Sequence, residues 1–426
     1  MLTLHVGVPT YSIPKFGIKA YDMKLLILST LYPGCTDSFY SRKPEVAIQS
    51  FAEQKAAIDY AALGWADYWS HALIPLGYNV LNVFYNVENL QRAWAREHSV
   101  KQYESLNLKQ IAILQIKSFQ PDILFFDDPD EALLLQIRSE VPSIRLVLGW
   151  SGSAVPMTNA WKYMDLILSC AQESVEQLKH SGYPATQIHH GFDPRLLGRI
   201  SQREKLYNFS FIGQIVRTSQ FHLLREKLLK RLANQCGITI FTSSADYGWK
   251  DDVKALLMAT AYDTVCALRD AGLPEEAVMA LPFISKAAPW SLRPTRPADP
   301  VLKPFMKPAV FGLEMLQVLS DSKITLNCHA DSSPRFASNM RLFETTGVGT
   351  CMITDWKDNL TELFTSDTEL VTYKSEDECI EKATWLLDHP CEREAIASAG
   401  QARTLREHTS SHRALLMDDI IRKALS

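Results

Sequence analysis

The sequence predicts an α/β protein with two parallel sheets, and three observations lead to this prediction. Along the N-terminal half, short apolar runs alternate with helical patterns, which is typical of parallel strands covered by helices. The same alternation starts again near residue 208. The chain has 426 residues, and at ~150 residues per domain this length accommodates two or three domains.

Five apolar runs are the candidate strands of the first half, at residues 25–29, 78–85, 123–126, 144–148 and 166–169. Helical patterns lie at 44–68, 106–119 and 173–180. Ligands on parallel sheets bind beyond the carboxyl ends of the strands. We therefore expect ligand-site loops at 30–40, 127–130 and 150–156.

The second half opens with an apolar strand at 208–212, which ends in Gly213 and precedes a strongly helical run at 221–234. Further candidate strands lie at 237–242, 324–328 and 351–354. The polar stretch 195–207 is interpreted as the connection between the domains. We accordingly divide the chain into an N-terminal domain, a C-terminal domain and a C-terminal helix, at 1–200, 201–410 and 411–426.

An insertion at 251–308 exceeds the connection that a compact α/β domain needs. It begins with an amphipathic helical pattern at 253–271 and ends in a proline-dense run. Long insertions in compact domains are usually functional or mobile. We expect an elaboration over the ligand cleft, and the alternative is a structural cover for an exposed sheet edge.

The composition is that of an ordinary globular protein, with 46% hydrophobic and 22% charged residues. A formal charge of −4 argues against a nucleic-acid partner. The eight cysteines contain no Cys-x-x-Cys pair, which argues against a zinc site and for reduced thiols in the cytoplasm. Neither a signal peptide nor an apolar stretch of ~20 residues is recognisable, so only peripheral membrane contact stays open.

The segment 338–355 carries the strongest functional signal. Arg341 and Glu344 lie three residues apart and so share one face of a predicted helix, Gly347 lies where a left-handed C-cap is expected, and 351–354 is apolar enough for a buried strand. The free N–H groups at a helix start bind phosphate, and a carboxylate further along accepts hydrogen bonds from sugar hydroxyls. This segment therefore predicts a sugar-nucleotide site.

Less specific interpretations of the same residues stay open. Glu344 is also explained as a helical carboxylate paired with Arg341. The pair Ser333 and Pro334 is an equally good helix start, which would place Ser338 inside the helix. In that case only the side chains of Asn339 and Arg341 reach a phosphate.

With Phe364, the stretch 391–400 and the stretch 407–413, this segment resembles the CgeB-like (spore-maturation type) glycosyltransferase family. The resemblance implies a GT-B fold, in which two Rossmann-like domains face a central cleft and the C-terminal one binds the nucleotide sugar. Glu344, followed five residues later by Gly349, matches the donor-ribose glutamate of the pattern Glu-x-x-x-x-Gly.

Two departures from the family pattern leave the stereochemistry and the acceptor class open. Phe336 stands eight residues before Glu344, where retaining GT-B enzymes often carry a second glutamate. The stretch 150–153, Trp-Ser-Gly-Ser, stands after the fourth strand, where many relatives carry an aspartate.

Further donor-site candidates follow from position. Gly213 after a strand lets the backbone approach a ligand, and the nearby Arg217 can neutralise a diphosphate. His329 follows the strand 324–328, although a satisfied buried histidine explains it equally well. His408 and His412 match a family motif that looks structural, and no third ligand suggests a metal site there.

A catalytic base is expected in the N-terminal domain if the reaction inverts the sugar carbon, because the acceptor hydroxyl then loses its proton as it attacks. The candidates are Asp37, Asp127 and Asp128, all placed by the sequence in loops at the cleft. Loop aspartates are more often caps or turn formers than bases.

The favoured function is transfer of a sugar from a nucleoside-diphosphate sugar to a hydroxyl of a glycan, lipid or small molecule. This hexosyltransferase-type reaction needs neither a metal nor another cofactor, because a helix N-terminus and basic side chains stabilise the leaving diphosphate. The alternatives are a nucleotide-sugar epimerase on the same fold and a non-catalytic sugar-nucleotide-binding protein.

Overall fold

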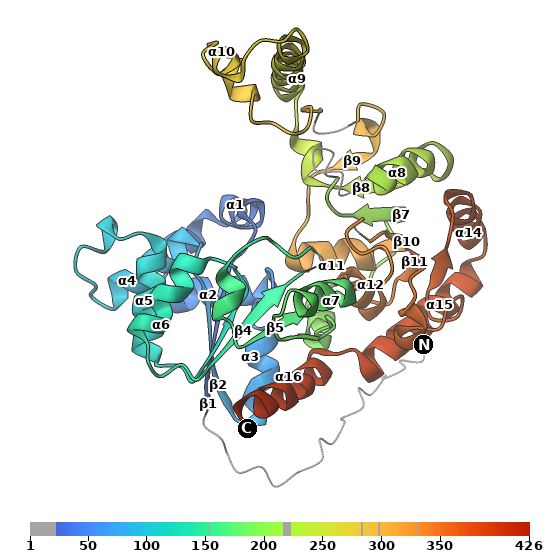
Figure 1. Ribbon diagram of the computed structural model, residues 1–426. Coiled ribbons are helices and arrows are strands. Elements are labelled where there is room, and N and C mark those ends of the chain that lie inside the picture. Colours follow the sequence, from blue (N-terminus) through green and yellow to red (C-terminus); the bar gives the residue numbers. More distant parts are fainter. Residues whose placement is uncertain (1–22, 153, 216–222, 283, 297–298, 330) are drawn as a thin grey trace, which may run out of the picture.

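The computed structural model describes residues 23–152, 154–215, 223–282, 284–296, 299–329 and 331–426. These residues form two α/β domains, each built on a six-stranded sheet in which the paired strands run parallel (Figure 1). The predicted fold class is therefore confirmed.

The first sheet has the strand order β2-β1-β3-β4-β5-β6. Its strands are β1 (Met23–Ser29), β2 (Tyr78–Phe84), β3 (Ile123–Phe126), β4 (Leu146–Ser151), β5 (Leu166–Ser169) and β6 (Ala185–Gln187). In the central strand, Leu26 lies opposite Leu81 on one side and Leu124 on the other. Helices cover both faces, which explains why β1 reads as one continuous apolar run rather than an alternating one.

The helices of this domain are α1 (Pro33–Arg42), α2 (Phe51–Tyr60), α3 (Tyr68–Leu73), α4 (Glu88–Glu97), α5 (Leu108–Phe119), α6 (Glu131–Glu140) and α7 (Gln172–His180). The single helix expected at 44–68 is instead a 3-10 turn, Pro44–Ile48, followed by α2. Ser50 and Glu53 form a reciprocal capping box that starts α2 anew.

The second sheet has the order β12-β11-β10-β7-β8-β9. Its strands are β7 (Tyr207–Ile212), β8 (Thr239–Phe241), β9 (Met306–Lys307), β10 (Ser322–Asn327), β11 (Cys351–Asp355) and β12 (Val371–Tyr373). Its helices are α8 (Leu223–Cys236), α11 (Gly312–Ser320), α12 (Arg341–Gly347), α13 (Leu360–Leu363), α14 (Glu376–Asp388) and α15 (Pro390–Glu407). The short strands β6, β9 and β12 were not predicted, because two or three residues carry no measurable pattern.

The chain crosses between the domains twice. On the first crossing, the backbone of Phe192 exchanges hydrogen bonds with His408 and Ser410, which belong to the second crossing. On the second, α16 (Ser410–Leu425) returns to the first domain, where Met417 and Ile421 pack into the core beneath the sheet. The two crossings are thus tied together, and α16 stabilises the first domain although it is last in the sequence.

The insertion forms an arm that projects from the second domain (Figure 1). It contains α9 (Trp249–Asp270) and α10 (Glu275–Met279) and leaves the sheet between β8 and the edge strand β9. Val265, Val278 and Ala287 build a small core of its own. The expectation of an elaboration over the cleft is wrong, because no described residue between 244 and 308 lines the interdomain cavity.

One face of α9 is apolar and exposed. Trp249, Val253, Leu256 and Leu257 follow helical spacing, and each is between 46% and 71% exposed. Across the described part of the chain, no helix combines the length and apolar character that crossing a bilayer requires.

Candidate functional site

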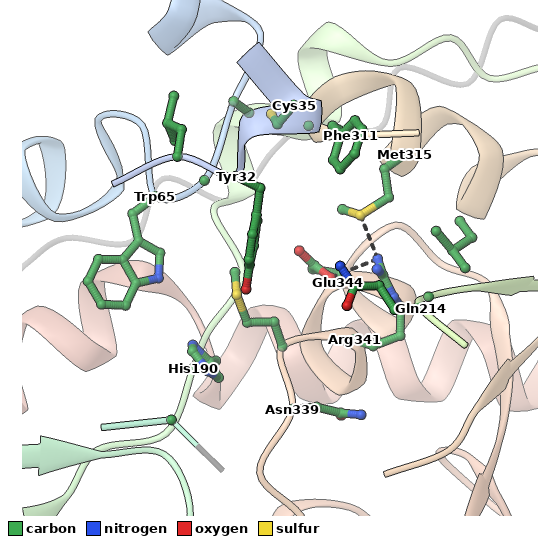
Figure 2. A pocket seen from close by; sticks show the side chains of 18 of the residues that line it. Tyr32, Cys35, Trp65, His190, Gln214, Phe311, Met315, Asn339, Arg341 and Glu344 are labelled. Atoms are coloured by element: carbon green, nitrogen blue, oxygen red, sulfur yellow. Dashed lines mark hydrogen bonds and ion pairs between the residues drawn. The ribbon is translucent and has the colours of Figure 1, made fainter. Parts of the chain in front are cut away.

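A cavity of about 1020 Å³ lies between the carboxyl ends of the two sheets. Loops that follow β1, β2, β3 and β4 form its first wall, and loops that follow β7, β8 and β10, with the start of α12, form the second (Figure 2). Most sequence-predicted site residues line it, namely Asp127, Asp128, Gly213, His329, Ser338, Asn339, Arg341 and Glu344.

Arg341 and Glu344 share one face of α12, as their spacing predicts. The Nη1 of Arg341 donates to Oε2 of Glu344 at 2.8 Å, and it also lies 2.8 Å from the sulfur of Met315. The two charged side chains are only 17% and 15% exposed, so the pair is not the solvated surface contact of the alternative interpretation. It presents a fixed carboxylate to the second wall of the cavity (Figure 2).

Helix α12 starts later than either predicted position. Its first residue is Arg341 and its N-cap is Met340, whose side chain makes no capping bond. Ser338 precedes the helix, is buried, and donates from Oγ to Oγ of Ser333 at 3.2 Å. The helix starts expected at Ser338 and Ser333 are therefore wrong, because the loop before α12 is held by side-chain contacts instead of helical turns.

The glycines after Glu344 serve different purposes from the one predicted. Gly349 adopts the left-handed conformation, with φ of 76°, whereas Gly347 is the last helical residue. A Cβ on Gly347 would lie 2.3 Å from the ring of Phe192, which packs against it from the interdomain crossing. Gly347 is thus required for close packing and not for a helix cap.

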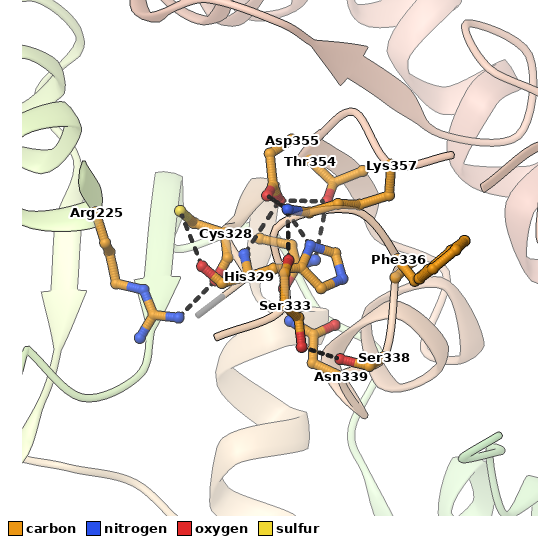
Figure 3. A network of polar contacts seen from close by, with 12 residues as sticks. Arg225, Cys328, His329, Ser333, Phe336, Ser338, Asn339, Thr354, Asp355 and Lys357 are labelled. Carbon is orange, nitrogen blue, oxygen red and sulfur yellow. Dashed lines mark hydrogen bonds and ion pairs between the residues drawn. The ribbon is translucent and has the colours of Figure 1, made fainter. Parts of the chain in front are cut away.

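Behind the second wall lies a buried polar network centred on Asp355, at the end of β11 (Figure 3). Its Oδ1 accepts from the backbone N–H of His329 at 3.1 Å and lies 2.7 Å from Nδ1 of that ring. Its Oδ2 is 3.1 Å from Nζ of Lys357. Nε2 of His329 has no partner among the described residues.

The carboxylate of Asp355 is the negative group of this network, next to the side chains of Lys357 and His329. Burial opposes ionisation of its carboxyl, but the charge and hydrogen bonds of His329, with the charge of Lys357, hold the pKa of Asp355 well below its ordinary value. The sequence analysis missed Asp355 and Lys357, although the first of them ends a strand that it identified.

Asn339 joins the network to the cavity. Its Nδ2 donates to Oδ1 of Asn327 at 2.7 Å, and Nδ2 of Asn327 donates to Oγ1 of Thr354 at 2.9 Å. Oδ1 of Asn339 is buried and has no partner in the described part of the chain. One amide oxygen at the cavity wall is thus left to accept a hydrogen bond.

Gly213 follows β7 at the cavity wall as expected, whereas Arg217 lies outside the described residues. A different arginine, Arg225 on α8, lines the cavity. It donates from Nη1 to the carbonyl of Gln214 at 2.9 Å and from Nη2 to the carbonyl of Cys328 at 2.6 Å. No sequence signal separated Arg225 from the other cations of that helix.

Arg225 is a buried cation without a carboxylate partner among the described residues. Its side chain sits over the ring of Phe211, the residue is 8% exposed, and its Nε–H is unpartnered. A buried charge is costly unless it is paired. The second wall therefore carries uncompensated positive charge and free donors, which suit an anionic ligand.

On the first wall, Asp127 and Asp128 follow β3. Asp128 accepts a hydrogen bond from the hydroxyl of Tyr85. Asp127 receives the backbone N–H of Thr30, while its Oδ1 is buried and has no partner in the part of the chain that the structure describes. Burial, followed by the charge of Asp128, raises the pKa of Asp127 to about 8.

Asp37 does not occupy the predicted loop. It lies within α1, is exposed, and is not among the residues that line the cavity. The reason is local: Pro33 starts α1 directly after a short turn, so the loop after β1 is shorter than the sequence suggested.

Aromatic side chains complete the first wall. The ring of Trp65 contacts Trp150 edge-on at 5.0 Å between centroids, and Trp150 lies 5.5 Å from His190. All three line the cavity. Burial, with smaller effects of His189 and Arg413, lowers the pKa of His190 to about 3, so this ring is neutral at physiological pH.

The histidines near the C-terminus hold the second crossing. Nε2 of His408 lies 2.9 Å from the carbonyl of Leu363, and its Nδ1 lies 2.9 Å from Nη2 of Arg413. Nδ1 of His412 contacts Thr409 in a capping box at the start of α16. Among the described residues, no group of His, Cys, Asp and Glu side chains is arranged to hold a metal ion.

Comparison with known proteins places this architecture in a class. Residues 290–419 match the sequence model of a family described as glycosyl transferase-like. No curated protein sequence matches the chain significantly.

Solved structures match nearly the whole chain. Anabaena HepE in complex with UDP-glucose has a TM-score of 0.52 and 12% identity, over 94% of this chain and 100% of that one. A glycosyltransferase from Rickettsia africae has a TM-score of 0.53 and 8% identity, over 95% and 99%. An α-glucosyltransferase, solved with UDP and a 13-mer DNA, has a TM-score of 0.51 and 12% identity, over 94% and 100%.

The fold is that of the GT-B glycosyltransferases. Its C-terminal part carries the glycosyl transferase-like sequence pattern, and the cavity lies between the two sheets. A glycosyltransferase is therefore the class that the fold and the family match support, and the epimerase alternative is not favoured.

Proposed function

We propose that this chain transfers a sugar from a nucleoside-diphosphate sugar to a hydroxyl acceptor, as a GT-B enzyme related to the CgeB-like family. The observation that carries the proposal is the pairing of two unlike walls across one cavity. The second wall presents Glu344, Asn339 and the cation Arg225. The first presents Asp127, one oxygen of which has no partner in the described part of the chain. A donor and an acceptor each find suitable groups.

The donor occupies the second wall in this proposal. The carboxylate of Glu344, fixed by Arg341, accepts hydrogen bonds from ribose hydroxyls, and the amide of Asn339 adds an acceptor. The diphosphate lies toward Arg225, whose buried guanidinium has no carboxylate partner among the described residues and whose Nε–H has no partner there. This positive charge offsets the negative charge that develops as the diphosphate leaves, so the proposed reaction needs no metal.

The acceptor occupies the first wall. Its hydroxyl approaches Oδ1 of Asp127, and the aromatic rings of Trp65 and Trp150 contact its apolar face. In an inverting displacement, the hydroxyl proton moves to Asp127 while its oxygen bonds to the sugar carbon. The bond from that carbon to the diphosphate oxygen breaks, and the diphosphate leaves with the electron pair. A pKa of about 8 suits a base that works near neutral pH.

A donor panel tests the proposal. The protein is incubated with uridine, guanosine, thymidine and adenosine diphosphate sugars, with and without mixed hydroxyl acceptors, and release of nucleoside diphosphate is measured. We expect release from one nucleotide class, stimulated by acceptor. Binding without release under every condition would favour the non-catalytic alternative, and absence of binding would refute the donor site.

A further inference from the structure

A carboxylate from the first domain holds the donor loop of the second. Glu173 lies in the first turn of α7, which borders the second domain beside α12 (Figure 1). Its Oε1 accepts the backbone N–H of Arg335 at 3.0 Å and that of Phe336 at 2.9 Å. Glu173 belongs to the first domain, whereas Arg335 and Phe336 belong to the second and are more than 160 positions away in the sequence. The contact therefore exists only while the two domains face each other.

The donor loop, defined here as residues 333–340, otherwise receives its contacts from its own domain. Nζ of Lys357 donates to the carbonyl of Ser333 at 2.8 Å, and Oδ1 of Asn359 accepts the N–H of Ala337 at 2.6 Å. The N–H groups of Arg335 and Phe336 have no partner other than Glu173 in the described residues. Two adjacent backbone donors thus depend on one side chain of the opposite domain.

The same helical turn also holds the acceptor wall. Oγ of Ser174, the next residue, donates to the carbonyl of Gly152 at 2.8 Å, and Gly152 lines the cavity. The first turn of α7 therefore contacts one loop of each wall. Oε2 of Glu173 is buried and has no partner among the described residues, so the contacts that hold this carboxylate there run through Oε1.

We propose that Glu173 is a positioning residue for glycosyl transfer, which fixes the donor loop against the acceptor wall when the domains close. This inference rests on the proposed function. The backbone N–H of Phe336 is thus held by a carboxylate of the other domain. Glu173 does not line the cavity, so it acts through the donor loop, whose Asn339 does line it.

The experiment combines amide hydrogen exchange over 333–340 with steady-state kinetics. The variants are Glu173→Ala, Glu173→Gln, which keeps an acceptor oxygen without charge, and Glu176→Ala. Glu176 is a matched control because it lies on the same helix and is exposed, with its Oε1 bonded only to Gln172.

We expect faster exchange at Arg335 and Phe336 in Glu173→Ala and a kcat for transfer that falls about ten- to hundredfold, because a charge-assisted contact is lost. Glu173→Gln should recover part of both. Affinity for the nucleoside diphosphate should change by less than about threefold, since Glu344 and Arg341 stay on α12.

Three outcomes would overturn the inference. Unchanged exchange in Glu173→Ala shows that the contact does not hold the loop. Faster exchange with unchanged kcat shows that the contact has no role in transfer. Equal losses of kcat and nucleotide affinity show general damage to the site. If the wild type itself transfers no sugar from any donor, the proposed function fails first, and that result is seen before the variants are compared.

Discussion

Glu344 combines a structural contact with a place on the cavity wall. It sits one turn after Arg341, is largely buried, and accepts its hydrogen bond through Oε2. The ion pair fixes the carboxylate without removing it from the cavity. A pair of this kind on an isolated helix contributes only about 0.2–0.5 kcal/mol, so its value here lies in orientation.

Replacing Glu344 by alanine should weaken nucleoside diphosphate binding by about 1–2 kcal/mol, or about tenfold or a little more, because a hydrogen bond to a ribose hydroxyl is lost. Isothermal titration calorimetry measures this change. Glu362→Ala, which removes an exposed carboxylate of the same domain, is the control. An unchanged affinity across all four nucleoside diphosphates would show that Glu344 does not contact the donor.

Asp127 predicts a pH dependence of transfer. A base acts in its deprotonated form, and the pKa of Asp127 is raised to about 8 by burial and by Asp128. The value of kcat/KM should therefore rise with pH and level off above about 8. Asp127→Asn should lower the plateau by about 100- to 10,000-fold. Asp128→Asn should shift the rise toward lower pH, because a neighbouring negative charge is removed.

The same raised pKa also affects stability. As pH rises, kcat/KM should increase, whereas the free energy of unfolding should decrease. The unfolded chain loses the Asp127 proton near the ordinary pKa of 3.8, whereas the folded chain keeps it up to about 8. Asp127 therefore reduces the free energy of unfolding as pH rises through this window. The free energies of unfolding of wild type and Asp127→Asn, measured by urea titration, should converge at low pH and separate as pH increases.

The catalytic role of Asp127 has a separate check. If the pH profile of kcat/KM is the same in Asp127→Asn as in the wild type, Asp127 is not the base.

At the scale of elements, the loop before α12 positions the proposed donor site. The sequence contains good helix starters at Ser333 and Ser338, yet the helix begins at Arg341. Tertiary contacts from Lys357, Asn359 and Glu173 hold the intervening backbone in a non-helical, bent course. Local propensity is a weak influence compared with several buried hydrogen bonds.

The arm formed by α9 and α10 is a second element with a testable role. Its described residues do not line the cavity, and its small core is separate from that of the donor domain. Replacing residues 249–296 by a short glycine-serine linker should leave thermal stability, nucleotide affinity and transfer close to wild type. Differential scanning fluorimetry, calorimetry and the transfer assay measure these properties. Steep loss of transfer alone would show that the arm reaches the acceptor.

At the scale of the whole molecule, the contacts between the two walls include the hydrogen bonds of Glu173, one exposed ion pair and one backbone hydrogen bond. Arg42 forms an ion pair with Glu314, in which both side chains are about half exposed, and the N–H of Leu313 donates to the carbonyl of Ala61 at 2.9 Å. Exposed ion pairs contribute about 0–1 kcal/mol. By contrast, α16 packs into the core of the first domain and fixes the hinge side.

Because α16 fixes the hinge side and the contacts across the cavity are weaker, we expect the two domains to open and close about the two crossings. Small-angle scattering should show a smaller radius of gyration with nucleoside diphosphate and acceptor than without ligand, because ligand contacts add to weak interdomain contacts. Arg42→Ala should enlarge the ligand-free form slightly and leave the liganded form unchanged. Identical scattering curves with and without both ligands would exclude closure.

The sequence by itself determined the two parallel sheets and that residues 338–344 of the second domain lie at the cavity. Strands that are buried on both faces are continuous apolar runs, so β1, β3 and β5 could be predicted from the sequence. The contact between Glu344 and Arg341 could be predicted because side chains three residues apart lie on the same face of any helix.

Only the tertiary structure decided which distant polar groups meet. Glu173 contacts a loop about 160 residues away, Arg225 reaches carbonyls at the ends of two strands, and Asp355 binds His329 across neighbouring strands. These contacts depend on sheet order and domain orientation, which no local periodicity encodes. The arm is a further example. Its amphipathic pattern predicts that α9 has an apolar side, but the direction in which the arm projects depends on its attachment beside the sheet edge.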